Sequence, residues 1–507
     1  MFSTRVLQSP LALLLLVWLS HPGCAQRPEV ARIDSFLTTL AQHQLFNGSM
    51  LVAEQGQIIY QRSVGFADTR RQVRHTDTTT FNLASLSKPF TAVAVLQLVE
   101  KKKLTLDDPL VTYFPDFAYP AVTIRHLLTH TSGLPQLERQ EDAYSNAHPD
   151  ELISNQTVYR HLIELKKPLL FQSGDKWAYN NTNYMLLAML VEKVSRQPFA
   201  TYLKQRVFKP AGMANTYVRE AEMPNTVRYT RPAMYVNQFH NVDSLDRKQF
   251  YTYYQLGSIT GPNNVISTVR DLWAFDRALF SGKLIGNELM ALAVTPVTLN
   301  NGKTYRQGSS TRSYGLGWTV YNTKTEPINN YVFHDGHIVG LTTFLHHNLT
   351  KDQTIIFYDN MDNNPIQVMV SVANLLNGQA PLAIEKRQSL ARVYGEALVA
   401  KGADHAISKF NELKDDTTHY YLAELDMNRL GFDLLKAPIA NHNELCLEVF
   451  KLNTLLYPKS GNTYDSYAMA LAHTNRKEEA IAMYRKSIAL WPANEDGKKA
   501  LQKLIEK

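Results

Sequence analysis

Residues 85–90 read Ser85-Leu86-Ser87-Lys88-Pro89-Phe90, and this stretch decides how the chain is interpreted. It leads into a run of apolar residues, and Pro89 stands in the first turn of the expected helix, where its missing N–H costs little. These features predict a helix from about Leu86 to Glu100. Residues three apart on a helix share one face, so Lys88 can reach the hydroxyl of Ser85.

A serine and a lysine on one helical face can act as a nucleophile and its base. At a helix N-terminus, free N–H groups and the positive end of the dipole favour the negative charge that develops in acyl transfer. Lys88 can accept a proton only if its pKa falls below the reference value of about 10.4, and burial lowers the pKa of an amine. From these residues alone, Ser85 is either a nucleophile or simply the N-cap of the helix.

The S-x-x-K spacing occurs a second time, at Ser173-Gly174-Asp175-Lys176. Ser-Gly is a turn pair, whereas the first copy opens an apolar helix. No G-x-S-x-G sequence is present, which argues against the nucleophile elbow of an α/β-hydrolase. The helical context therefore favours Ser85 and Lys88 as the reactive pair.

Strand signals stand at both ends of the region before residue 384. An opening hairpin is expected from Met50–Ala53 and Ile58–Arg62, which flank a turn. A strand-rich block ends near Tyr358, and its β-branched and aromatic runs are Tyr331–His334, Leu341–His346 and Thr354–Tyr358. Helical segments lie between the two ends. We therefore expect an α/β protein of the α+β type, in which distant segments close one sheet.

Past about Ile384 the strand signals disappear, and helical spacing of apolar residues continues to the C-terminus. Pro458 and Pro492 stand 34 residues apart, the length of a tetratricopeptide repeat, and apolar or small residues precede each at equivalent places. Residues 385–507 are therefore expected to form a helical tetratricopeptide-like repeat domain, or else a plain helical bundle. A repeat array would offer its concave surface to a protein or peptide partner.

Residues 1–25 have the features of an export signal, with an apolar stretch from Leu11 to Leu19 and small residues before an expected cleavage after Ala25. The protein is expected to be periplasmic or secreted, with a catalytic domain over residues 26–384. An earlier cleavage would leave Cys24 for lipid attachment, and only then is contact with a membrane expected. No later stretch is long and apolar enough to span a bilayer.

The chain has two cysteines, Cys24 and Cys446, which excludes a disulfide framework. It contains no CxxC, HExxH or phosphate-loop pattern, so no metal and no other cofactor is expected. His126 and His130 have the i, i+4 spacing of zinc ligands, but no third ligand accompanies them, and a structural role is expected. The net charge of +7 is not gathered into a basic stripe, which argues against nucleic-acid binding.

Two further motifs follow Ser85 along the chain. Trp177-Ala178-Tyr179-Asn180-Asn181 places its tyrosine 94 residues after Ser85, and His334-Asp335-Gly336-His337 begins 249 residues after it. With S-x-x-K, they resemble the three motifs of the class C β-lactamase and penicillin-binding-protein superfamily, whose third motif is K-T-G in lactamases and H-x-G in many relatives. The resemblance covers about residues 35–370, with supporting stretches at residues 126–135, 267–272 and 314–318. It implies a β-lactamase/transpeptidase-like antiparallel sheet flanked by helices, plus an all-helical part.

The resemblance also implies roles for the residues of the first two motifs. Ser85 would be the nucleophile that forms an acyl-enzyme, and Lys88 would accept or relay its proton. Tyr179 would share the work of the base or protonate the leaving group. Asn181 would orient Lys88 and a substrate amide. Asn180 stands where relatives usually have serine, which leaves the fine substrate preference open.

The third motif is expected to form the opposite wall of the site. His334 would line the site across from the nucleophile, and Gly336 would let substrate approach the strand closely. The backbone N–H groups of Ser85 and His337 would form the oxyanion hole. A lysine in place of His334 would carry a fixed charge that attracts the carboxylate of a β-lactam, whereas a histidine is mostly neutral near pH 7.

These features together predict an exported serine hydrolase, with esterase or D-amino-acid peptidase activity of the carboxypeptidase type. Its substrate would be a small ester, amide or peptide. A β-lactamase is the alternative within the same class. A catalytically weak protein that binds partners through its repeats is the alternative from another class, although the intact motif residues argue against it.

Overall fold

The computed structural model describes the chain in segments, which are residues 27–68, 71–136, 153–219, 259–308, 311–321, 330–338, 341–361, 365–437 and 439–506. The expected export signal over residues 1–25, with Cys24, lies outside these segments and stays a prediction. Within the segments, no helix is both long enough and apolar enough to cross a membrane.

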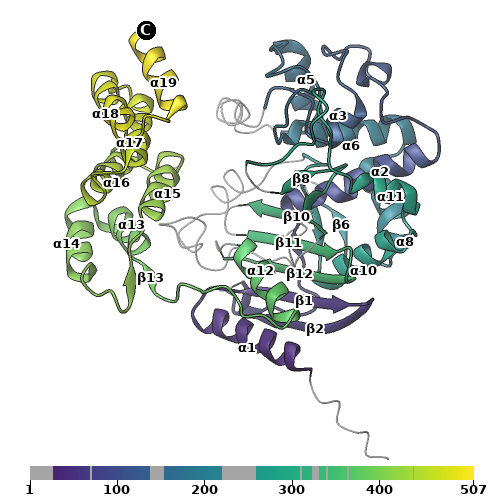
Figure 1. The fold of residues 1–507 in the computed structure, drawn as a ribbon, viewed down its shortest axis with the longest axis horizontal. Coiled ribbons are helices and arrows are strands. Elements are labelled where there is room, and N and C mark those ends of the chain that lie inside the picture. Colours follow the sequence, from purple (N-terminus) through teal and green to yellow (C-terminus); the bar gives the residue numbers. More distant parts are fainter. Residues whose placement is uncertain are drawn as a thin grey trace, which may run out of the picture.

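In the described segments, seven antiparallel strands form the central sheet (Figure 1). Strand β1 (Gly48–Glu54) pairs with β2 (Gln57–Val64) on one side and with β12 (Gln353–Asp359) on the other. Outward from β12 the order is β11 (Leu341–Asn348), β10 (Tyr331–Ile338), β9 (Thr319–Tyr321) and β8 (Arg312–Tyr314). The expected hairpin, β1 and β2, and the three expected later strands, β10, β11 and β12, are therefore confirmed. Segments from both ends of residues 48–359 form one sheet.

The two faces of the sheet bury different hydrophobic clusters, because successive side chains of a strand point to opposite faces. On one face, Val52, Phe344 and Phe357 belong to the cluster that packs against α1 (Pro28–Gln42) and α12 (Pro365–Leu376). Figure 1 shows these two helices against the strands that begin and end the sheet region. On the other face, Leu51, Leu345 and Ile356 belong to the larger cluster that the remaining helices cover.

The larger cluster is built around α2 (Lys88–Glu100), whose residues 88–98 are all buried. This burial explains the unbroken apolar run, since a helix that is apolar all round must be surrounded by protein. The helices around it are α3 (Ile124–Leu128), α5 (Asn155–Leu165), α6 (Asn181–Ser195), α7 (Phe199–Leu203), the π-helical turn η3 (Lys204–Phe208), α8 (Lys209–Ala211), α10 (Val269–Phe280) and α11 (Asn287–Ala293).

Short elements connect the sheet to these helices. A small sheet of β5 (Phe81–Asn82), β7 (Val265–Ser267) and β6 (Tyr217–Val218) leads directly into η1 (Ala84–Ser87), a single 3₁₀ turn before α2. The other short elements are β3 (Phe66–Asp68), β4 (Val73–Arg74) and η2 (Leu110–Thr112).

The C-terminal part is helical and has its own hydrophobic cluster. A two-stranded pair, β13 (Gln388–Ser389) and β14 (Tyr420–Tyr421), stands near its start. Its helices are α13 (Leu390–Lys401), α14 (Ala403–Leu413), α15 (Glu424–Leu435), α16 (His442–Leu456), α17 (Gly461–His473), α18 (Lys477–Leu490) and α19 (Glu495–Glu506). Figure 1 shows them as a stack beside the sheet region, joined to it by one extended linker after α12.

Candidate active site

The turn that carries Ser85 is held in a strained conformation. Ala84 has a φ of 47°, which is unusual for a residue with a Cβ, and its N–H donates to Asn82 Oδ1 at 2.8 Å. The hydroxyl of Thr343, on β11, donates to the carbonyl of Leu83 at 2.8 Å. Both polar groups of the Leu83–Ala84 peptide are therefore hydrogen-bonded, which fixes the position from which Ser85 reaches the site.

Ser85 does not cap α2. The α-helix begins at Lys88 rather than near Leu86, because Ser85 lies inside the preceding 3₁₀ turn η1. Neither element has a side-chain capping hydrogen bond, so the structure does not support the interpretation of Ser85 as an N-cap. In a 3₁₀ turn, residues i and i+3 lie almost directly above one another, which keeps Ser85 and Lys88 on one face.

Gly336 packs against the turn of the nucleophile. A Cβ at this position would lie 1.9 Å from the carbonyl oxygen of Leu83, so a side chain here would push η1 away from β10. The sequence predicts that Gly336 makes room for substrate. In the structure, it makes room for the protein's own backbone, and contact with substrate stays a prediction.

Lys88 is completely buried, with 0% of its surface exposed. Its Nζ donates to Ser85 Oγ at 3.1 Å and to the carbonyl of Pro262 at 3.3 Å. The same Nζ lies 4.7 Å from the centre of the Tyr179 ring. The lysine is thus within proton-transfer distance of the serine, and an aromatic face lies against its ammonium group.

Tyr179 is held in place by His130. The two ring centres are 4.4 Å apart, and the N–H of Asn180 donates to His130 Nδ1 at 3.2 Å. Because Nδ1 accepts, the proton of the neutral ring is on Nε2. Burial, together with the charge of Lys88, keeps the pKa of His130 well below its ordinary value. The imidazole of His130 is therefore neutral, and it packs against the ring of Tyr179.

The structure separates His126 from His130. His126 Nδ1 accepts the N–H of Thr123 at 3.2 Å in the cap of α3, whereas His130 lies behind Tyr179. In the part of the chain that the structure describes, no group of three His, Cys, Asp or Glu residues has the arrangement of a metal site. From the sequence only a structural role was expected for His130, and its place beside Tyr179 was missed.

The asparagines of the second motif lie at the start of α6. Asn180 is buried and caps this helix, with its Oδ1 accepting the N–H of Thr182 at 2.9 Å and its Nδ2 donating to the carbonyl of Leu134 at 2.9 Å. The asparagine that stands here in place of the serine of relatives is therefore held by hydrogen bonds within the protein. Asn181 is the first residue of α6, two positions after Tyr179, and its role toward Lys88 and substrate stays a prediction.

His334 is a buried, neutral histidine. Its Nδ1 lies 2.7 Å from the carbonyl of Asp335, and since a carbonyl can only accept, Nδ1 carries the proton. Nε2 must then accept from the hydroxyl of Tyr314, at 3.1 Å. Burial lowers the pKa of His334 to about 4, and the nearby charge of Lys88 also lowers it. Both ring nitrogens are thus bonded to the protein, and the ring carries no fixed charge at neutral pH.

A cavity of about 370 Å³ is lined by Ser85, Tyr179 and His334, whereas Lys88, Asn181 and Gly336 are not among its lining residues. The residues that line it are Ser85, Trp177, Tyr179, Tyr305, Gln307, Arg312, Ser313, Tyr314, Thr319, His334, Asp335 and His337. Ser85 and His337 therefore share one cavity, as an oxyanion hole requires, although that role stays a prediction. The sequence assigned no role to Tyr305, Gln307 or Arg312, because no local motif marks them.

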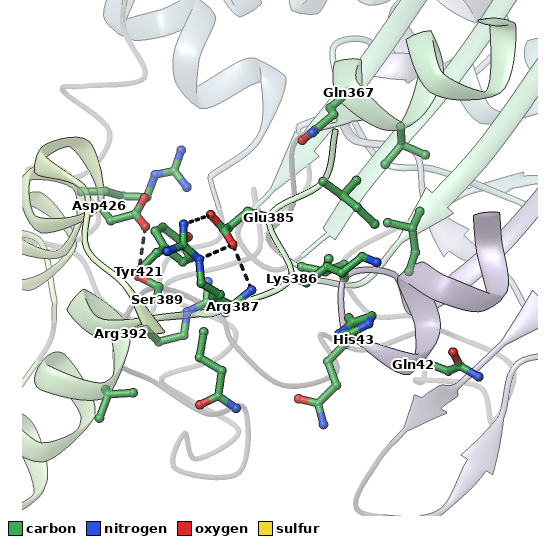
Figure 2. A pocket seen from close by; sticks show the side chains of 18 of the residues that line it. Gln42, His43, Gln367, Glu385, Lys386, Arg387, Ser389, Arg392, Tyr421 and Asp426 are labelled. Carbon is green, nitrogen blue, oxygen red and sulfur yellow. Dashed lines mark hydrogen bonds and ion pairs between the residues drawn. The ribbon is translucent and has the colours of Figure 1, made fainter. Parts of the chain in front are cut away.

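Figure 2 shows a second cavity, of about 450 Å³, between the end of α1, the linker after α12 and the first helices of the C-terminal part. The hydroxyl of Ser389 donates to Asp426 at 3.0 Å, and Arg387 binds both carboxylate oxygens of Glu385. In this second cavity Ser389 faces the carboxylate of Asp426, and no residue of the three motifs lines the cavity.

The sequence model of the family named Beta-lactamase matches residues 33–382, which is more than half of the chain and includes every residue that lines the cavity at Ser85. The chain belongs to the beta-lactamase family. A penicillin-binding protein of Bacillus subtilis is 33% identical over 338 residues, which are 66% of this chain and 72% of that protein. Esterase EstB of Burkholderia gladioli is 35% identical over 205 residues, 38% of this chain and 52% of the esterase.

Solved structures agree with this beta-lactamase-family assignment. A penicillin-binding protein from Bacillus halodurans superposes with a TM-score of 0.57 and 25% identity, over 67% of this chain and 99% of its own. The beta-lactamase fold thus accounts for the sheet region, whereas the family match ends before the helical part begins at α13.

Proposed function

We propose that this chain is an exported serine hydrolase that forms an acyl-enzyme on Ser85 and acts as an esterase or as a peptidase on D-amino-acid substrates. The observation that carries the proposal is the 3.1 Å hydrogen bond from the buried Lys88 to the hydroxyl of Ser85, in a cavity that Tyr179 also lines. Related proteins that bear the names esterase and penicillin-binding protein support both substrate classes.

The geometry supports a two-step acyl transfer. Lys88, as the neutral amine, takes the proton of Ser85 while the Ser85 oxygen attacks the substrate carbonyl, and the N–H groups of Ser85 and His337 hold the resulting oxyanion. The leaving group departs with a proton from Tyr179, which leaves an ester on Ser85. Water then attacks this ester and gives a proton to the Tyr179 phenolate, while Lys88 returns its proton to Ser85 Oγ, so that the acid and the free serine are released.

The neutral His334 supports a preference for substrates other than β-lactams. A lysine at this position would add a fixed positive charge, whereas the pKa of about 4 keeps this ring uncharged at pH 7. Arg312 lines the same cavity, so a substrate carboxylate still has a cation within it. We expect ester turnover to exceed turnover of the cephalosporin nitrocefin, and nitrocefin turnover comparable with that of a p-nitrophenyl ester would contradict this order.

Labelling with a fluorophosphonate tests the nucleophile directly. The probe should phosphonylate the wild-type protein at Ser85 and should not label Ser85→Ala, with the modified peptide identified by mass spectrometry. Labelling of Ser85→Ala at a different serine, with activity retained, would sink the assignment.

We also propose that the C-terminal helices form a tetratricopeptide-like array that binds a protein or peptide. Large apolar side chains stand exposed on it, including Leu425 at 72% and Leu455 at 70%. Pro458 and Pro492 follow α16 and α18 closely, as repeat ends would. Removal of residues 385–507 should leave ester kinetics unchanged if the array serves a partner, and lost turnover by a folded truncated protein would place it in catalysis.

Export and lipid attachment form a separate proposal. The apolar N-terminal stretch supports removal of residues 1–25, and Cys24 supports lipid attachment as the alternative. The mass of the mature N-terminus distinguishes the two, and an intact Met1 on the mature protein would contradict both.

A further inference from the structure

Trp177 and Tyr305 form an aromatic wall of the cavity at Ser85. Their rings stack with centres 4.7 Å apart and an angle of 13° between the planes. Trp177 continues the wall inward, because its ring lies 6.4 Å from that of Tyr179 and 5.9 Å from that of Tyr314. The wall therefore runs from the partly exposed Tyr305 through Trp177 to the ring of Tyr179.

The wall is assembled from two segments that are far apart in the sequence. Trp177 follows the turn at residues 173–175, which carries the second copy of S-x-x-K. Tyr305 lies on a hairpin, since Thr298 and Thr304 form an antiparallel bridge and the N–H of Tyr305 donates to the carbonyl of Val297 at 2.9 Å. Nothing local in either segment requires that the rings meet.

Asn300, at the tip of this hairpin, fastens the two segments together. Its N–H donates to the carbonyl of Gly174 at 2.9 Å, and its Nδ2 donates to the carbonyl of Ser173 at 2.9 Å and to Asp175 Oδ1 at 2.8 Å. Gly174 has a φ of 87°, and a Cβ there would lie 2.4 Å from Asn300 Oδ1. The turn is thus shaped to receive this side chain, which fixes Tyr305 over Trp177.

We propose that the Trp177 and Tyr305 wall is a subsite for a flat aromatic ring carried by the substrate. The proposal rests on the proposed acyl-enzyme function of Ser85. Aromatic rings attract one another in stacked and edge-to-face arrangements beyond the effect of burial alone. The wall and Ser85 line the same cavity, so a ring bound there would belong to a substrate whose carbonyl is at the nucleophile.

Three esters test the subsite and show which half of the substrate carries the ring. Ethyl acetate is the reference, ethyl phenylacetate adds a phenyl group to the acyl half, and benzyl acetate adds one to the alcohol half. Wild-type protein should hydrolyse one of the two aromatic esters with a kcat/KM on the order of tenfold or more above that of ethyl acetate. Trp177→Ala and Tyr305→Ala should each bring that ratio close to one, and an unchanged ratio in both would overturn the proposal.

A hairpin variant separates the wall from general damage to the fold. Asn300→Ala should lower the ratio through a raised KM for the aromatic ester, because the ring pair loses its anchor. The side chain of Lys303, on the same hairpin, is exposed, so Lys303→Ala should keep the wild-type ratio. Equal losses of the ratio in both variants would contradict the anchoring role.

Binding of small aromatic ligands to the inactive Ser85→Ala variant tests the subsite separately from the proposed esterase function. Calorimetry should detect phenylacetate or benzyl alcohol, whichever matches the preferred ester, at a concentration where acetate and ethanol give no signal. The double variant with Trp177→Ala should lose this binding. If wild-type protein hydrolyses none of the esters but the binding pattern holds, the esterase proposal fails and the subsite stands. If neither aromatic ligand binds, the subsite is overturned.

Discussion

The cavity at Ser85 and the cavity of Figure 2, which lies between the sheet region and the helical C-terminal part and is here called the junction cavity, are similar in volume, about 370 and 450 Å³. They differ in how far the charged groups beside them are buried. At the first, Lys88 is wholly buried and donates to the serine hydroxyl. At the second, Arg387 and Glu385 pair with 39% and 41% of their side chains exposed, and Ser389 donates to a carboxylate. A serine in a cavity becomes a candidate nucleophile only where a base is held out of water beside it.

The largest difference between the cavities should appear when each loses its serine. Ser85→Ala should lower kcat/KM for a p-nitrophenyl ester on the order of 10³-fold or more, because the atom that forms the acyl bond is gone. Ser389→Ala removes the serine of the junction cavity and should leave the steady-state kinetics at the wild-type level. Comparable losses in both variants would break the distinction between the two sites.

Removal of Lys88, which donates to Ser85, or of Lys386, which lines the junction cavity, should give the next largest difference. Lys88→Met keeps an apolar chain of similar length in a buried position but removes the proposed base, and we expect kcat to fall by about 10²- to 10⁴-fold. Lys386→Met, at the junction, should have no effect on kcat. Circular dichroism and Tm should show that both variants are folded. A Lys88→Met protein with full activity would require a different base.

Burial also makes stability depend on pH in the sheet region. The pKa values of His75 and His334 are lowered to about 4 and that of His346 to about 3, chiefly by burial. Between these values and about 6.5 the unfolded chain binds more protons, so the free energy of unfolding rises with pH. Each histidine should cost roughly 2 kcal/mol of stability as the pH falls from 6.5 to 5.

His346 offers the cleanest test of this pH dependence. Both its ring nitrogens are buried without a hydrogen-bond partner among the described residues, so His346→Phe should raise Tm at pH 5 and flatten its dependence on pH. His405→Gln changes an exposed histidine in α14 and serves as the control. The same slope of Tm against pH in wild type and His346→Phe would disprove the burial argument.

The smallest effect is expected at the junction. Arg387→Gln breaks the ion pair with Glu385, which lies in water, and exposed pairs of this kind contribute little to stability. We expect Tm by differential scanning calorimetry and kcat/KM for the ester to match the wild type. A clear fall in kcat/KM would instead show that the linker affects the active site, and the two cavities would then not be independent.

The sequence predicted most of what depends on local pattern. The S-x-x-K spacing on an apolar run placed Lys88 next to Ser85, and β-branched runs located β10, β11 and β12. It placed the helix start too early, because a 3₁₀ turn and an α-helix share the i, i+3 relation. It missed the support that His130 gives to Tyr179, since spacing alone reveals only its relation to His126.

The wall of the cavity could not be predicted for a different reason. Tyr305 and Arg312 have no motif around them, and they reach the site through the pairing of a hairpin and a strand. Asn300 acts across more than a hundred residues, on a turn that the sequence marked only as a chance copy of S-x-x-K. Such contacts are set by tertiary structure, and a single sequence carries no periodic signal for them.

The position of β1 inside the sheet has a consequence for the order of events during synthesis. Its hairpin partner β2 follows within a few residues, but its other neighbour begins 299 residues after the end of β1. At the usual rates of translation, a ribosome needs roughly 15 to 60 s to make that length of chain. During this interval β1 has one open edge and the fold cannot close. A chain built this way stays without its finished core until nearly all of residues 33–382 have been made.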